Sequence, residues 1–92
     1  MTLEDKVTEN LAYAETCADD GNFQATENFI YIAEHYAAKN GTSISARVSE
    51  LKNLVYTKAL ESAERYSEAG NIPAANYFLR QIEKYAYDIK DK

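Results

Sequence analysis

The chain contains few of the residues that interrupt helices or cross-link a small fold. Its 92 residues include one proline, three glycines, one cysteine and no tryptophan. Because Cys17 is alone, an internal disulfide and a metal site of several cysteines are both excluded. No segment approaches the ~20 apolar residues that span a bilayer, and Met1–Lys6 has acids where a signal peptide has basic residues. We therefore expect a cytoplasmic protein with no membrane partner.

Positive charge is also scarce. Ten Lys and Arg residues against 15 Asp and Glu residues give a formal net charge of −5 at pH 7, which disfavours nucleic acid as a partner. The charge is uneven, because residues 1–41 carry two basic and eight acidic residues, a net charge of −6. This acidic half leaves open an antitoxin-like role, in which the chain inhibits a basic partner protein.

The sequence repeats itself at a constant offset of 49 positions, without gaps. The repeated residues are Leu11, Ala14, Glu15, Gly21, Asn22, Ala25, Phe29, Glu34, Tyr36 and Ala37, which recur as Leu60, Ala63, Glu64, Gly70, Asn71, Ala74, Phe78, Glu83, Tyr85 and Ala86. A repeat of this kind indicates two copies of one structural unit.

Hydrophobic periodicity predicts four helices and no strand. We expect Thr2 to cap the first helix with Asp5 in a capping box, and Asn22 to cap the second. A stop at Gly41 is followed by a cap at Thr42 or Ser43, and a long third helix covers about residues 44–69. Only its later part corresponds to the first helix, so residues 44–51 are an extension.

Each helix has an apolar stripe that predicts its buried face. The predicted stripe of the second helix is Ala25, Phe29, Ala33 and Tyr36, and Ile30, Ile32 and Ala37 broaden it. That of the third helix includes Ile44, Val48, Leu51, Val55 and Ala59, and that of the fourth consists of Ala75, Phe78, Leu79, Ile82, Ala86 and Ile89. The expected central core is Phe29, Ile32, Tyr36, Phe78, Ile82 and Tyr85.

These patterns predict an all-α fold of two tandem helical hairpins that form a four-helix, bundle-like single domain over residues 1–92. The first hairpin covers about residues 2–41 and the second about residues 43–90. One hairpin cannot bury its own apolar face, so each must pack against the other or against a second chain.

Around each repeated glycine the sequence resembles the helix-turn-helix unit of tetratricopeptide repeats, in which a glycine, a large residue two positions later and small residues at set positions let two helices pack closely. The second hairpin fits this spacing with Gly70, Ile72, Ala75 and Leu79. The first fits partly, with Gly21, Phe23 and Ala33, whereas Ala25 and Phe29 are one place early. Because the period here is 49 residues rather than 34, the resemblance implies the same rule of helix packing and not membership of the tetratricopeptide family.

The hairpins also look like those of helical nuclease-type domains of toxin and antitoxin systems, whose activity requires an arginine shortly before a histidine on a late helix. The only histidine here, His35, lies on the second predicted helix without such an arginine, so nuclease activity is not inferred. Phosphate loops, nucleophile elbows and zinc spacings are also missing, and we expect no enzyme activity and no cofactor. The alternative is a bundle that binds a metal or small ligand through Glu34, His35 and Glu83.

Eight tyrosines are many for a chain of this length. Four of them fall away from the predicted core stripes, namely Tyr31, Tyr56, Tyr77 and Tyr87. Rigid amphipathic tyrosines are enriched at protein interfaces. We therefore predict an interaction surface at these four positions and a non-enzymatic role in protein–protein interaction or self-association, with a homodimer as the expected assembly.

Overall fold

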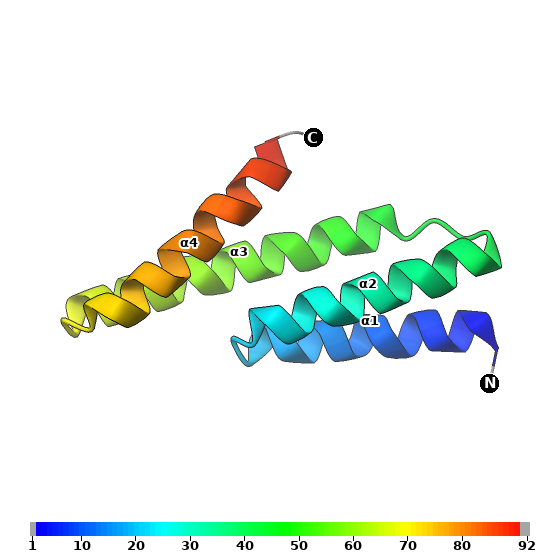
Figure 1. The fold of residues 1–92 in the computed structure, drawn as a ribbon, viewed down its shortest axis with the longest axis horizontal. Helices are drawn as coiled ribbons and strands as arrows, with labels where there is room; N and C mark the ends of the chain where they lie inside the picture. The colour runs from blue at the N-terminus through cyan, green and yellow to red at the C-terminus, as the bar shows by residue number, and fades with distance from the viewer. Residues whose placement is uncertain (1, 91–92) are drawn as a thin grey trace. The chain divides into compact units, whose positions relative to one another are not determined.

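The computed structural model describes the backbone of residues 2–90 and the side chains of residues 2–85. In this range the chain forms four helices and no strand, which confirms the predicted all-α class (Figure 1). The helices are α1 (Leu3–Asp19), α2 (Phe23–Asn40), α3 (Ser45–Glu68) and α4 (Ile72–Lys90). The chain divides into two compact units, one ending at Leu51 and the other beginning at Lys52, so the division lies within α3.

The first unit is built on an antiparallel pair formed by α1 and α2 (Figure 1). The predicted capping box at the start of α1 is confirmed. The Thr2 hydroxyl accepts a hydrogen bond from the Asp5 backbone N–H at 3.1 Å, and the Asp5 carboxylate accepts one from the Thr2 N–H at 3.2 Å. These bonds satisfy two amides that have no partner inside the helix.

The turn between α1 and α2 combines a left-handed glycine with an asparagine cap. Gly21 has φ +80°, a conformation that only glycine adopts readily. The backbone N–H of Asn22 donates to the Cys17 carbonyl at 2.9 Å, which closes a Schellman motif. The Asn22 side chain then accepts from the Ala25 N–H at 3.2 Å and caps α2, as predicted.

The core of the first unit includes the beginning of α3. Its central buried cluster consists of Ala14, Ile30, Val48 and Leu51, with Leu11, Phe29 and Ile44 packed against it. Residues 44–51, which the sequence marked as an extension, therefore cover the first hairpin. An ion pair reinforces this contact, because the Arg47 guanidinium lies 3.0 Å from the Glu15 carboxylate on α1 and 2.9 Å from Glu50.

Three sequence predictions about the first unit were wrong in whole or in part. The buried face of α2 includes Ile30, Ala33 and Ala37 of the predicted apolar surface. It also includes Phe23 and Thr26, which the prediction omitted, whereas Ala25, Phe29 and Tyr36 are only half-buried. Ile32, which was placed in the central core, is 37% exposed. The N-cap position of α3 is occupied by Ile44, whose carbonyl accepts from the Val48 N–H at 2.9 Å, rather than by Thr42 or Ser43.

The second unit contains the rest of α3 and the helix α4, joined by a turn with the hydrogen bonds of the first turn. Gly70 has φ +79°, the Asn71 N–H donates to the Tyr66 carbonyl at 2.9 Å, and the Asn71 side chain accepts from the Ala74 N–H at 3.3 Å. Buried side chains in this unit are Val55, Ala59, Ala63, Ala75 and Tyr85. The Tyr66 and Phe78 rings stack with centroids 5.6 Å apart. The predicted core residues Ala86 and Ile89 lie outside the described side chains.

Candidate interaction surface

The first turns of α4 present large apolar side chains to solvent. Because the Asn71 cap fixes where α4 starts, Ile72, Ala75 and Leu79 follow one another at helical spacing and share one face. Ala75 is buried, but Ile72 is 56% exposed and Leu79 is 47% exposed. This face of α4 is therefore only partly covered by the residues that the structure describes.

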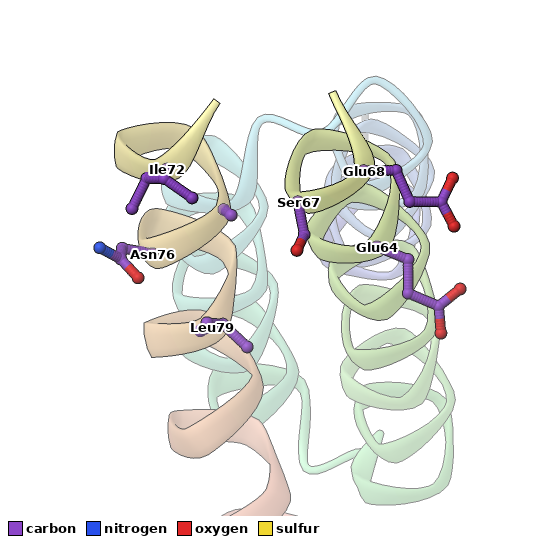
Figure 2. A pocket seen from close by; sticks show the side chains of 7 residues that line it. Glu64, Ser67, Glu68, Ile72, Asn76 and Leu79 are labelled. Carbon is purple, nitrogen blue, oxygen red and sulfur yellow. The ribbon is translucent and has the colours of Figure 1, made fainter. Parts of the chain in front are cut away.

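The exposed side chains border a groove between α3 and α4 with a volume of about 480 Å³. Its lining residues are Glu64, Ser67, Glu68, Ile72, Ala75, Asn76 and Leu79. Figure 2 shows the two helices on either side of the groove, with Ile72 and Leu79 on α4 and Ser67 on the side of α3 toward α4. An open, mostly apolar groove of this kind accommodates a side of another helix better than it encloses a small molecule.

The α3 side of the groove is acidic. Glu64 and Glu68 are exposed, and their carboxylates extend away from α4 (Figure 2). Among the residues that the structure describes, Glu64 has no ion-pair partner. A partner that lies on this edge therefore meets two negative charges next to an apolar strip.

The four predicted tyrosines are divided between the two units, and one of them lies outside the described side chains. Tyr31 is 73% exposed and belongs to the first unit, whereas Tyr56 and Tyr77 belong to the second. Tyr56 is half-buried, and Tyr77 is 42% exposed with its ring edge-to-face against Phe78 at 5.0 Å. Tyr87 lies outside the described side chains. Tyr77 is thus the predicted tyrosine closest in sequence to the groove residues Asn76 and Leu79.

The residues proposed for a metal or ligand site are also divided between the two units. Glu34 and His35 are exposed side chains of α2, and His35 lies beside Tyr36 with ring centroids 6.0 Å apart. Glu83 is an exposed side chain of α4 in the second unit. Within the described residues, no group of three or more His, Cys, Asp or Glu side chains is placed to hold a metal ion.

Glu34 does contribute to a second, smaller hollow in the first unit. This hollow has a volume of about 230 Å³ and lies at the turn between α2 and α3. Its walls include Ala37, Thr42 and Ile44, and the Thr42 hydroxyl already accepts a hydrogen bond from the Asn40 side chain at 2.9 Å. The hydroxyls of Ser43 and Ser45, which lie 3.3 Å apart, also line this hollow.

Tyr13 and Arg47 of the first unit have raised pKa values, and neighbouring glutamates contribute most to both shifts. A 3.0 Å hydrogen bond to Glu9, together with the charge of that carboxylate, raises the pKa of Tyr13. The hydrogen bond to Glu50, together with the charges of Glu15 and Glu50, raises the pKa of Arg47. Both groups are ordinary surface pairs, and neither points to acid–base catalysis.

Sequence reasoning missed the groove because it assigned Leu79 to the buried core and treated Ile72 only as part of the turn. The available clue was the extension at residues 44–51. This extension adds apolar residues before the second hairpin, and the first hairpin has no equivalent segment before it. Its apolar residues must therefore cover one of the two hairpins, and the other hairpin lacks such a cover.

The described residues form an all-helical fold with an open, mostly apolar groove in its second unit. No helix among the described residues combines the length and the apolar character needed to cross a membrane. No family model, curated protein or solved structure matches the chain.

Proposed function

We propose that the chain is a non-enzymatic, helical protein-interaction module whose binding face is the groove of the second unit. The observation that carries this proposal is the exposure of Ile72 and Leu79 beside one another on α4. Large apolar side chains gathered beside a groove are typical of sites where another protein binds. Tyr77, on the same helix, supplies an amphipathic ring of the kind that is enriched at interfaces.

We also propose that the two hairpins are copies of one unit, with turns similar to those of tetratricopeptide repeats, within a single domain. The hydrogen bonds of the two turns support this, because each backbone bond around Gly21 and Asn22, and the side-chain cap of Asn22, has a counterpart 49 positions later around Gly70 and Asn71. The helix bounds agree with the same offset, since α1 ends at Asp19 and α3 at Glu68.

The partner is proposed to be a protein, either a second copy, as expected from the sequence, or a different chain. Site-specific photo-crosslinking distinguishes these cases because it captures whichever protein occupies the groove. A benzophenone amino acid is placed at position 79 and the protein is irradiated in the cells that produce it. We expect one discrete adduct, and its mass shows whether the partner is a second chain of 10.4 kDa or another protein.

A matched control uses the same photoreactive residue at position 84 of α4. Lys84 is exposed and lies about 140° around the helix from position 79, away from the groove. We expect no adduct, or a much weaker one, from this position. Equal crosslinking from both positions, or no adduct from position 79, would refute the proposal.

A further inference from the structure

The first unit shows how a hairpin of this sequence is covered by a third helix. Three residues of its covered face have counterparts 49 positions later in the second unit: Ala14 corresponds to Ala63, Glu15 to Glu64, and Ile30 to Leu79. Ala14 and Ile30 pack against Val48 and Leu51 at the start of α3. The burial and the ion pairs of these matched residues can therefore be compared with and without a covering helix.

Burial differs sharply between the matched apolar positions of α2 and α4. Ile30 is 6% exposed beneath the start of α3, whereas Leu79 is 47% exposed. Ala63, the counterpart of Ala14, is buried. The interior of the second hairpin is therefore closed, and the exposed apolar side chain is Leu79 at its surface. In the described structure, the second hairpin therefore has an apolar face of the kind that residues 44–51 cover in the first.

The charged positions correspond in the same way. In the first unit, Glu15 lies at the edge of the covered face and binds Arg47 of the covering segment at 3.0 Å. Its counterpart Glu64 lines the groove of the second unit and has no ion-pair partner among the described residues. An occupant with a basic residue at the position of Arg47 would complete the same pair.

We propose that the groove of the second unit binds one helix of a partner protein in the way that residues 44–51 cover the first unit. That helix carries apolar side chains at positions i, i+4 and i+7, as in Ile44, Val48 and Leu51, and Arg or Lys at position i+3, as in Arg47. The apolar residues lie on Leu79, the counterpart of Ile30, and on the exposed Ile72 beside it in the groove, and the basic residue pairs with Glu64. This inference rests on the proposed function and specifies its partner.

A second copy of the chain is a poorer occupant. The segment of the sequence that has this pattern in full, residues 44–51, is already packed in the core of its own first unit. Its release would expose Val48 and Leu51, which are 5% and 1% exposed. A partner helix of different sequence and the same chemistry carries no such cost.

The test uses the chain's own covering segment as a model ligand. A peptide of residues 42–54, acetylated at the N-terminus and amidated at the C-terminus, is titrated into the isotope-labelled full chain and amide chemical shifts are followed. Because isolated helices of this length are marginal, weak binding is expected and the peptide is taken to the limit of its solubility. We expect saturable shifts centred on Glu64, Ile72, Ala75 and Leu79.

Two peptide variants separate the apolar from the charged part of the contact. Val48→Asp in the peptide is expected to weaken binding at least about tenfold, because an apolar anchor is lost from the centre of the contact. Arg47→Glu in the peptide is expected to weaken binding about two- to fivefold, the range of an exposed ion pair. Glu64→Lys in the protein, an exposed change that leaves the fold intact, should restore the affinity for the Arg47→Glu peptide.

Three results would overturn the inference. The first is the absence of saturable shifts, and the second is a set of shifts confined to α1 and α2, which shows that the peptide replaces the chain's own segment. The third is a dimer in light scattering that Leu79→Glu converts to monomer, which makes a second copy the occupant. If the peptide fails while position 79 still gives a crosslinked adduct, the inference fails and the proposed function stands. A missing adduct refutes the proposed function itself.

Discussion

The contrast between Ile30 and Leu79 gives a direct thermodynamic prediction. Ile30 is 6% exposed within the cluster of the first unit, and Ile30→Ala should lower the free energy of unfolding by about 3 kcal/mol, since truncation of a core Ile loses its burial and leaves a cavity. Leu79 is 47% exposed, so Leu79→Ala loses about half of that burial and leaves no closed cavity, and should cost about 1 kcal/mol. The predicted difference between the two variants is thus about 2 kcal/mol.

Urea unfolding, followed by far-ultraviolet circular dichroism at low protein concentration, measures both losses on the full chain. Ile30→Val serves as a control for the first site and should cost about 1 kcal/mol, because one methylene is removed. Unchanged m-values would show that the variants alter stability and not the extent of unfolding. Equal losses for Ile30→Ala and Leu79→Ala would refute the reasoning, because Leu79 would then be covered within the chain itself.

Two further predictions concern the first unit and the turns. Asn22→Ala and Asn71→Ala should each lower the stability by about 1 kcal/mol in the same urea assay, because each removes a matching N-cap hydrogen bond; markedly unequal losses would show that the two turns are not equivalent. The Glu9 hydrogen bond raises the pKa of Tyr13, so the folded state favours the neutral phenol, and this stabilisation is complete below about pH 10 and is lost as the pH rises through the higher folded value. A difference titration of the tyrosine absorbance between the native chain and Tyr13→Phe should therefore show a midpoint above about 10, and a midpoint at or below that value would contradict it.

The helices and their turns could be predicted because their signals are local. Thr2 with Asp5, and Asn22 after a glycine, act on amides within three residues, so the sequence alone determines the cap. The left-handed conformation at Gly41 likewise ends α2 where the sequence predicts a stop.

The buried faces were harder to predict because burial depends on which side a neighbour covers. Thr26 is fully buried although it is polar, since its hydroxyl donates to the Asn22 carbonyl at 3.0 Å. Asn10 is buried for the same reason, with its amide donating to the Lys6 carbonyl at 2.8 Å. A pattern based only on apolar residues omits both positions. In α2, where Thr26 lies, the predicted apolar surface therefore shifts toward Ile32, which is exposed.

The candidate surface was only partly accessible to sequence reasoning. The sequence singled out tyrosines by their number and their distance from the predicted stripes, and Tyr31 and Tyr77 are indeed exposed. It did not predict that Ile72 and Leu79 are exposed. An apolar residue in an amphipathic helix gives the same sequence pattern whether or not another helix covers it. Exposure of such residues is a property of the tertiary structure.

The offset of 49 residues is explained by residues 44–51, the segment that covers the first hairpin. A hairpin equivalent to α1 and α2 needs only the residues from Leu3 to Asn40, followed by a turn. The remaining part of the period is about two helical turns at the start of α3, which pack on Ala14 and Ile30 before the second unit begins at Lys52. The length of the period is therefore set by a helix that belongs to the core of the first unit. Because the face around Leu79 is of the same kind and stays exposed, the physical chemistry of the covered hairpin defines the helix that the second hairpin should bind.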